Sequence, residues 1–441
     1  MHPHAHPRRP RLLAVALAAV ALGACTAGGQ GSRGPEPGTP GDSEAQDDTG
    51  DETPAAGEGL WDPNGLPEFQ LEFAEDDWQD TLWAAIDQDD ECADRLYVEA
   101  GLRFVNPVDG STEDMGRIGV RLRGHSGLQE GEYERPGFKL KLHHLTAGQE
   151  LHDAERINLL GTEGDYSLMR EHLALMISRE AGLPAPRNAY ALLSVNGEPQ
   201  GLYPYTEEPD DDAYVDAHFD GEGSLYKAAG YCGAEGDFAW LGDEPADYAA
   251  TYEPKGDTPL EAMETDLIPL IACANSDEVV ECLPDHIDLD AWLTATAVDM
   301  VLPDVDGMAS SGQNFMLHHG DGGFVTYRWD LDQALTVYNA GSQSIFDVHP
   351  TWNADFESLI AEALMTHWRE DYCTEVLRVA ELAAPDGLLG EAVEDRRAFL
   401  AAHIEADPFM DAQHWGWIVD DILDVARERH PAVVAEAQAC P

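Results

Sequence analysis

The feature that most constrains the fold is a change of hydrophobic periodicity near residue 255. Before it, short runs such as "FQLEF" (69–73) and 95–105 alternate apolar and polar residues, as half-buried strands do. After it, most segments repeat apolar residues with a helical period, and a single predicted hairpin around Gly320–Gly323 interrupts them. This order predicts an α+β fold with a strand-rich N-terminal part, a helix-rich C-terminal part and a cleft between two lobes.

The N-terminus has the pattern of a targeting segment. A basic region containing Arg8, Arg9 and Arg11 precedes the apolar run 12–24, which is too short for a typical spanning helix and predicts a signal peptide over 1–24. Its end, Leu22-Gly23-Ala24-Cys25, resembles a bacterial lipobox. That resemblance implies cleavage before Cys25 and lipidation of the cysteine, and the alternative is an ordinary secreted protein.

The amino-acid composition separates the rest of the chain into a disordered tether and an ordered domain. Residues 25–60 contain mostly Gly, Pro, Ser, Thr and acidic residues, so they cannot bury a core and are expected to form a disordered tether behind the lipidated cysteine. The ordered domain is predicted over 61–441, with an N-lobe over about 61–230 and a C-lobe over about 231–441. We therefore expect an exported protein that is anchored to the bacterial membrane from outside the cytoplasm.

The net charge limits which molecules the protein can bind, and the number of cysteines indicates disulfides. The chain has 85 acidic and 25 basic residues, a formal net charge of −60. Such a surface repels nucleic acid and anionic lipid, so we expect no nucleic-acid partner and membrane contact only through the lipid anchor at Cys25. Six other cysteines in an exported chain suggest disulfides, and Cys273 and Cys282 are close enough in sequence to form one.

A candidate metal site lies at the end of the late hairpin. Asp330 and Asp332 follow the apolar run that ends at Trp329, and residues two apart on a strand point the same way, so both could present oxygens to one Mg²⁺ ion. Upstream, Asp306 and Asn314 bracket a small polar loop. This is the layout of a phosphoryl-transfer site, in which the loop aspartate takes a hydroxyl proton and the other two positions hold metal. The alternative is a capped turn, which on spacing alone is the more common structure.

Basic residues mark a second candidate region, near the middle of the N-terminal part. Two predicted strands carry Arg121, Arg123, Lys139 and Lys141, four of only 25 basic residues, on either side of a Gly- and Ser-containing loop. Such a loop lets backbone amides approach an anion, and a lysine beside it can reach phosphate. Glu171, on the next predicted helix, could pair with a strand lysine. The alternative is ordinary cross-strand pairing with the acidic surface.

Several stretches, taken together and in order, resemble the spore-coat CotH kinase-like family. That resemblance implies an atypical protein-kinase-like fold that binds ATP with Mg²⁺ or Mn²⁺ and phosphorylates proteins. The matching stretches lie within about 95–335: "RLRGHSG…RPGFKLKL", "RINLLGTEGDYSLMREHLALMISREAGLPAP", "LLSVNGEPQGLYPYTEEPDDDAY", "GSLYKAAG", "DGMASSGQNFMLHH" and "YRWDLDQAL".

By position, the resemblance implies Asp306 as the catalytic aspartate. It implies Asp330, with Asp332 as a further candidate, as the metal aspartate and Asn314 as the second metal ligand. Seven residues separate Asp306 from Asn314, whereas ordinary protein kinases have four, and this departure puts the role of Asn314 in question.

The same resemblance implies roles in the N-terminal part. Lys139 or Lys141 is the phosphate-binding lysine, and the sequence does not choose between them. Glu171 is the expected lysine partner, and Glu207 either faces the nucleotide or ends its hairpin. Lys227 matches the "LYK" of the family, and no role follows from its position.

Three classes of function remain open at this point. The first is a lipid-anchored phosphotransferase acting on protein hydroxyls. The second is a non-catalytic cell-surface, coat or adhesion protein on the same fold, and the third is a secreted metal-dependent hydrolase. The chain retains the loop aspartate, the hairpin aspartates and the strand lysines, which favours the first class.

Overall fold

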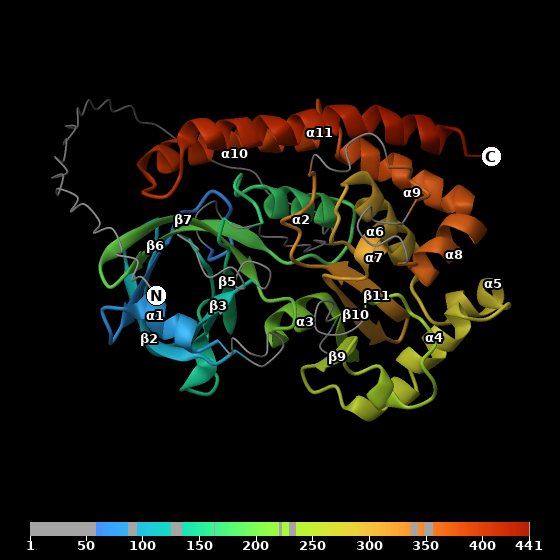
Figure 1. Cartoon of the computed structure of the whole chain (residues 1–441), viewed down its shortest axis with the longest axis horizontal. Coiled ribbons are helices and arrows are strands. Elements are labelled where there is room, and N and C mark those ends of the chain that lie inside the picture. Colours follow the sequence, from blue (N-terminus) through green and yellow to red (C-terminus); the bar gives the residue numbers. More distant parts are fainter. Residues whose placement is uncertain are drawn as a thin grey trace, which may run out of the picture. The chain divides into compact units, whose positions relative to one another are not determined.

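The structure is a computed structural model (Figure 1). It describes residues 59–86, 95–124, 135–162, 164–219, 223–228, 235–336, 343–347 and 356–440. The predicted signal peptide and nearly all of the predicted tether lie outside these residues, as do Ser126 and Gly127 of the loop that was expected to approach an anion.

Seven strands form a closed barrel in the N-terminal part. Their order is β1-β2-β3-β4-β5-β7-β6, and all neighbours are antiparallel except β1 and β6. One face of each strand is buried in the core of the barrel, as the alternation in the sequence predicts; Phe69 and Leu71 are examples. The strands are β1 (Glu68–Phe73), β2 (Val98–Val105), β3 (Thr112–Arg123), β4 (Gly137–Lys141), β5 (Arg156–Leu159), β6 (Asn188–Val195) and β7 (Glu198–Glu207).

A second sheet of four strands has the order β11-β10-β8-β9. It comprises β8 (Ser224–Ala228), β9 (Tyr252–Lys255), β10 (Phe315–Gly320) and β11 (Gly323–Arg328). The predicted late hairpin is confirmed, because β10 and β11 pair from Phe315↔Arg328 to Gly320↔Gly323. β8 joins this sheet by pairing with β10, so the sheet draws one strand from before residue 230.

Helices make up most of the rest. Two stretches with helical periodicity in the sequence, 167–183 and 289–302, contain the helices α2 and α6, whereas the apolar stretch 259–276 forms a 3₁₀ segment followed by a short helix. The α-helices are α1 (Trp78–Ala84), α2 (Arg170–Glu180), α3 (Asp212–Phe219), α4 (Leu267–Ala274), α5 (Val279–Cys282), α6 (Leu289–Val301), α7 (Met308–Ser311), α8 (Leu359–His367), α9 (Arg369–Leu382), α10 (Leu388–Ala406) and α11 (Ala412–Gln438). The 3₁₀ segments are η2 (Leu142–His144), η4 (Pro245–Asp247), η5 (Leu260–Glu264) and η6 (Leu283–Asp285).

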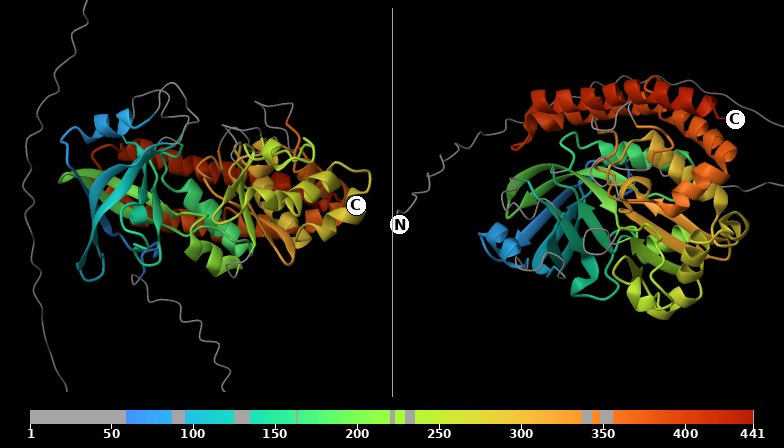
Figure 2. Two further views of the ribbon diagram at one scale, coloured as in Figure 1. Left: turned by 90° about the horizontal axis from the view of Figure 1, so that it is seen from below. Right: turned by 45° about the vertical axis from the view of Figure 1, so that its right-hand side comes forward.

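The last two helices connect the barrel to the helical part. α10 packs on β7 and α11 packs on α9, and Figure 2 shows these two red helices extending across both parts. After α10, the buried carboxylate of Asp407 accepts a hydrogen bond from the Leu202 amide at 2.7 Å and lies 3.3 Å from Arg135 Nη1. Trp415 Nε1 donates to the Ser167 carbonyl at 2.9 Å, just before α2. The segment from α10 to α11 therefore contacts both β7, through Asp407, and the residues just before α2, through Trp415.

These observations confirm the predicted α+β architecture, with a strand-rich N-terminal part and a helix-rich C-terminal part. Among the described residues, the disulfides Cys273–Cys282 and Cys373–Cys440 cross-link the helical part, and the first is the pair expected from the sequence. Among the described residues, we find no helix with the length and apolar character needed to cross a bilayer.

Candidate active site

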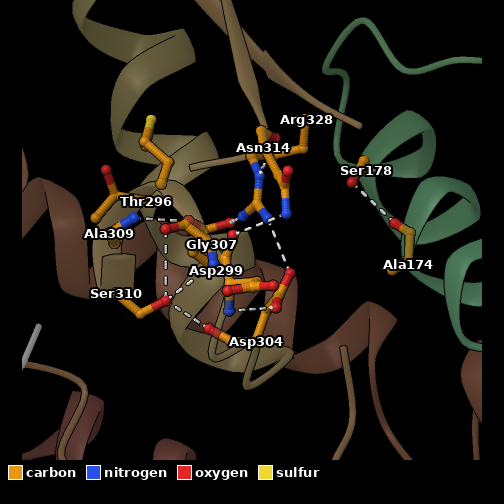
Figure 3. A network of polar contacts seen from close by, with 12 residues as sticks. Ala174, Ser178, Thr296, Asp299, Asp304, Gly307, Ala309, Ser310, Asn314 and Arg328 are labelled. Atoms are coloured by element: carbon orange, nitrogen blue, oxygen red, sulfur yellow. Dashed lines mark hydrogen bonds and ion pairs between the residues drawn. The ribbon is translucent and has the colours of Figure 1, made fainter. Parts of the chain in front are cut away.

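A buried arginine organises the loop that follows α6 (Figure 3). Arg328, at the end of β11, donates to Asp299 on α6, to Asp304 Oδ2 at 2.8 Å and to the Asn314 carbonyl at 2.9 Å. Burial opposes the charged form, but Asp299 and Asp304 together raise the pKa of Arg328. One guanidinium thus holds both ends of the loop and the helix before it.

The loop presents Asp306 at its bend. Its backbone amide donates to Asp304 Oδ1 at 2.9 Å, and Ser310 braces the same turn by donating to the Asp304 carbonyl at 2.6 Å. The half-buried carboxylate of Asp306 makes no hydrogen bond to any described residue. Burial, with a further contribution from Asp330, raises its pKa. Asp306 therefore has the free acceptor oxygens and the raised basicity that a proton-accepting carboxylate needs.

Asn314 lies beside Asp306 despite their separation in sequence. Its side-chain amide donates to the Asp306 carbonyl at 3.2 Å, and its backbone has a φ of 55°, which asparagine tolerates better than most residues. The seven intervening residues are accommodated by α7, whose Ser311 hydroxyl donates to the Gly307 carbonyl at 3.1 Å. The longer spacing thus still brings the two positions together.

Asp330 and Asp332 lie beyond the hairpin, and this corrects the reasoning from strand alternation. β11 ends at Arg328, and Asp330 has a φ of 57°, so the two aspartates are not on a strand. They are nonetheless electrostatic neighbours. Burial, followed by Asp330 and Glu171, raises the pKa of Asp332 well above its usual range. Asp330 and Asp332 are therefore brought close together by the left-handed backbone conformation at Asp330, and not by the alternation of side chains along a strand.

The cation that acts electrostatically on Glu171 is Arg123, an arginine at the end of β3, and not one of the expected strand lysines. Arg123, at the end of β3, donates to Asp330 Oδ1 at 2.8 Å. Glu171, in the first turn of α2, is buried, and burial raises its pKa to about 7 while the Arg123 charge opposes that rise. Its Oε2 has no hydrogen-bond partner among the described residues. Arg123 therefore links the barrel to the segment that follows the late hairpin, and neither Lys139 nor Lys141 makes this contact.

The two candidate lysines are in different environments. Lys139 Nζ lies 2.5 Å from Glu208, which also accepts from Asn158 at 2.9 Å. Burial opposes ionisation, but Lys139 and Arg156 hold the pKa of Glu208 well below its usual range. Lys141 Nζ instead lies 5.8 Å from the centroid of the Tyr97 ring. Of the two lysines, Lys139 is the one that joins the charged cluster at the end of β7.

Glu207 is engaged in a separate contact. Its carboxylate accepts from the Arg187 amide at 3.0 Å and forms an ion pair with the Arg187 guanidinium at 2.5 Å. Glu207 is the last residue of β7, and its sequence neighbour Glu208 is the carboxylate that meets Lys139. Glu208 directly follows the end of β7, so the backbone after the strand, and not the alternation within it, directs this glutamate to the lysine.

A cation is electrostatically suited to the group formed by Glu171, Asp306, Asp330 and Asp332. Within the described residues, Arg123 is the one side chain that forms an ion pair with this group, although four carboxylates interact there. In the same part of the chain, no three His, Cys, Asp or Glu side chains are arranged so that they could hold a metal ion. The residues therefore fit a divalent cation by charge, and its ligand shell is not pre-formed.

The model of the CotH kinase protein family matches residues 120–430. The chain belongs to the CotH kinase family. No curated protein matches the chain. Among solved structures, the Helicobacter pylori proinflammatory kinase CtkA is similar with 10% sequence identity and a TM-score of 0.32, over 69% of this chain and 94% of CtkA.

The CotH family match includes every candidate site residue described above. Sequence reasoning assigned no role to Arg123, Glu208 or Arg328. Arg123 stood out among the few basic residues, and the buried contacts of Arg328 depend on tertiary structure alone.

Proposed function

We propose that this chain is an exported ATP-dependent phosphotransferase of the atypical protein-kinase type. It transfers the γ-phosphoryl group of ATP to hydroxyl groups of proteins and requires Mg²⁺ or Mn²⁺. The observation that carries the proposal is the meeting of Asp306, Asn314 and Asp330 around an arginine-anchored loop in a member of the CotH kinase family.

Asp306 acts as the base in this proposal. The acceptor hydroxyl oxygen forms a bond to the γ-phosphorus, the bond to the β–γ bridging oxygen breaks, and the hydroxyl proton passes to the Asp306 carboxylate. The raised pKa of Asp306 and its lack of a hydrogen bond to the described residues support this role.

Asp330, Asp332 and Asn314 would hold the divalent cation, which when bound neutralises charge on the phosphates. For Oδ1 of Asp330 to join the other carboxylate oxygen in holding the cation, its ion pair with Arg123 has to loosen. Glu171, whose Oε2 lacks a partner, is placed to receive Arg123 in its place. Arg123 and Lys139 then supply positive charge from the barrel side.

The proposal places the protein outside the cytoplasm. A signal peptide over 1–24, a lipid on Cys25 and a tether over 25–60 anchor the kinase domain to the bacterial membrane. The lipobox-like sequence supports this placement, and the two disulfides suit an oxidising compartment. The substrates are then proteins exposed on the same side of the membrane.

The direct test is transfer of labelled phosphate from ATP to a generic acceptor protein in the presence of Mg²⁺ or Mn²⁺. Transfer by the wild-type chain that is lost in Asp306→Asn and Asp330→Asn supports the proposal. Nucleotide binding with no transfer under any metal would overturn it.

The ion pair between Arg123 and Asp330 favours one alternative, a non-catalytic cell-surface or coat/adhesion protein on the same fold. In that case Asp330 is a structural residue that ties β3 to the late hairpin. Asp330→Asn should then lower the free energy of unfolding and leave no metal-dependent binding to lose.

A further inference from the structure

Lys227 is a cation that the proposed catalytic groups do not use. It lies on β8, and its Nζ is 3.9 Å from the centroid of the Trp329 ring. Within the described residues it forms no hydrogen bond and no ion pair. A partly buried ammonium with this environment retains donors for a ligand.

The carboxylates around Lys227 already have partners. Glu208 pairs with Lys139 at 2.5 Å, and Asp210 pairs with Arg156 at 3.0 Å. Both carboxylates influence Lys227 electrostatically, yet neither comes within ion-pair distance of it. The positive charge of Lys227 is therefore not directly neutralised by a side chain in the described part of the molecule.

A second donor lies next to it. Trp329 Nε1 is buried and has no hydrogen-bond partner in the described structure. Trp329 directly precedes Asp330, and Asp330 neighbours Glu171, whose Oε2 is also without a partner. Near Asp330, the described residues thus include hydrogen-bond donors without partners, on Lys227 and Trp329, and an acceptor without a partner, Glu171 Oε2. Such donors can bind an anion and such an acceptor can bind a cation, and a metal-bound phosphate contains both charges.

We propose that Lys227 and Trp329 form a phosphate-binding pair, in which the ammonium and the indole N–H donate to oxygens of the metal-bound phosphate chain. The inference rests on the proposed function and adds two binding residues to it. Lys227 belongs to the second sheet and Trp329 directly follows the late hairpin, whereas Arg123 and Lys139 belong to the barrel.

The charge of Lys227 gives the pair a pH signature. Burial lowers the pKa of Lys227 to about 8; Glu208 and Asp210 raise it, and Lys139 and Lys255 lower it. Phosphate binding by wild-type protein should therefore weaken as the pH rises from 7 to 9. Lys227→Arg keeps its charge over this range, so its binding should depend less on pH.

The test measures dissociation constants by isothermal titration calorimetry with the full chain, using Mg-ATP, Mg-tripolyphosphate and adenosine. Loss of a charge-assisted hydrogen bond in Lys227→Met should weaken both phosphate ligands about 10- to 100-fold. Adenosine, which carries no phosphate, should bind equally well to both proteins. Lys255→Met is the matched control, because Lys255 lies on the neighbouring strand β9 and pairs with Glu253 at 2.7 Å.

Trp329→Phe keeps an aromatic ring and removes only the N–H, so it tests the same pair if Lys227→Met fails to fold. It should weaken both phosphate ligands and leave adenosine unchanged. Equal loss for adenosine and ATP, or unchanged phosphate binding in Lys227→Met and Trp329→Phe, would overturn the inference while leaving the phosphotransferase proposal intact. Absence of nucleotide and tripolyphosphate binding by the wild-type chain would instead overturn both.

Discussion

Arg328→Met should destabilise the protein strongly, because it removes one guanidinium that three groups share. The side chain of Arg328 is 2% exposed and donates to Asp299, Asp304 and the Asn314 carbonyl. Removing one partner of a buried ion pair costs about 3–5 kcal/mol, since it leaves uncompensated charge. We expect a loss of about that size in the free energy of unfolding near neutral pH.

The loss should depend on pH in a defined direction. Burial raises the pKa of Asp304 to about 6, and the Arg328 charge opposes that rise. Without Arg328 the folded-state pKa rises further, so the folded variant binds more protons than the unfolded chain over a wider range. Its stability then falls with increasing pH, and the two proteins diverge as pH increases above about 6.

Urea unfolding followed by circular dichroism, at pH 5.5 and pH 8, measures both effects. Arg328→Met combined with Asp304→Asn and Asp299→Asn is the matched variant, because it removes the charges that Arg328 leaves behind. It should recover part of the lost stability at pH 8. A loss below about 1 kcal/mol, or no recovery in the combined variant, would refute the view that this ion-pair network is what holds the loop.

Three further predictions address the site and its support. Asp306→Asn should abolish phosphotransfer while leaving ATP affinity within about threefold, as measured by calorimetry, because the residue accepts a proton and does not hold the nucleotide; a parallel loss of binding would contradict that role. Lys139→Met should weaken ATP binding more than Lys141→Met does, since only Lys139 joins the cluster with Glu208; the reverse order would assign the phosphate contact to Lys141. Replacing Cys373 and Cys440 by alanine should lower the free energy of unfolding by about 4 kcal/mol, the chain-entropy expectation for this loop, and an unchanged urea midpoint would contradict it.

The sequence predicts much of the fold because its local signals agree with the structure. For example, Asn-Gly is the dipeptide that favours a two-residue hairpin turn, and Asn196-Gly197 joins β6 to β7 with φ values of 50° and 80°. The sheet that β8 joins could not be predicted in this way. Its pairing with β10 links residues about ninety positions apart, and short apolar runs do not specify such partners.

In the candidate site, too, some contacts could be predicted from the sequence and others could not. Asp306, Asn314 and Asp330 are found near one another, which the loop-and-hairpin pattern predicts. The contacts of the barrel residues depend on which strand face meets the hairpin, and no local pattern encodes that. For this reason Arg123, and not a strand lysine, lies among the carboxylates near Glu171, and Glu208 contacts Lys139 although the sequence assigned it no role.

The central claim is that the carboxylates around Asp330 bind a metal–nucleotide complex. Electron paramagnetic resonance of Mn²⁺ measures this directly, because the signal of free Mn²⁺ falls when the ion is bound. With ATP present, we predict that the wild-type chain depletes the free signal beyond what ATP alone does, and that Asp330→Asn abolishes this extra depletion while remaining folded. Equal depletion by wild-type protein and Asp330→Asn would contradict the account.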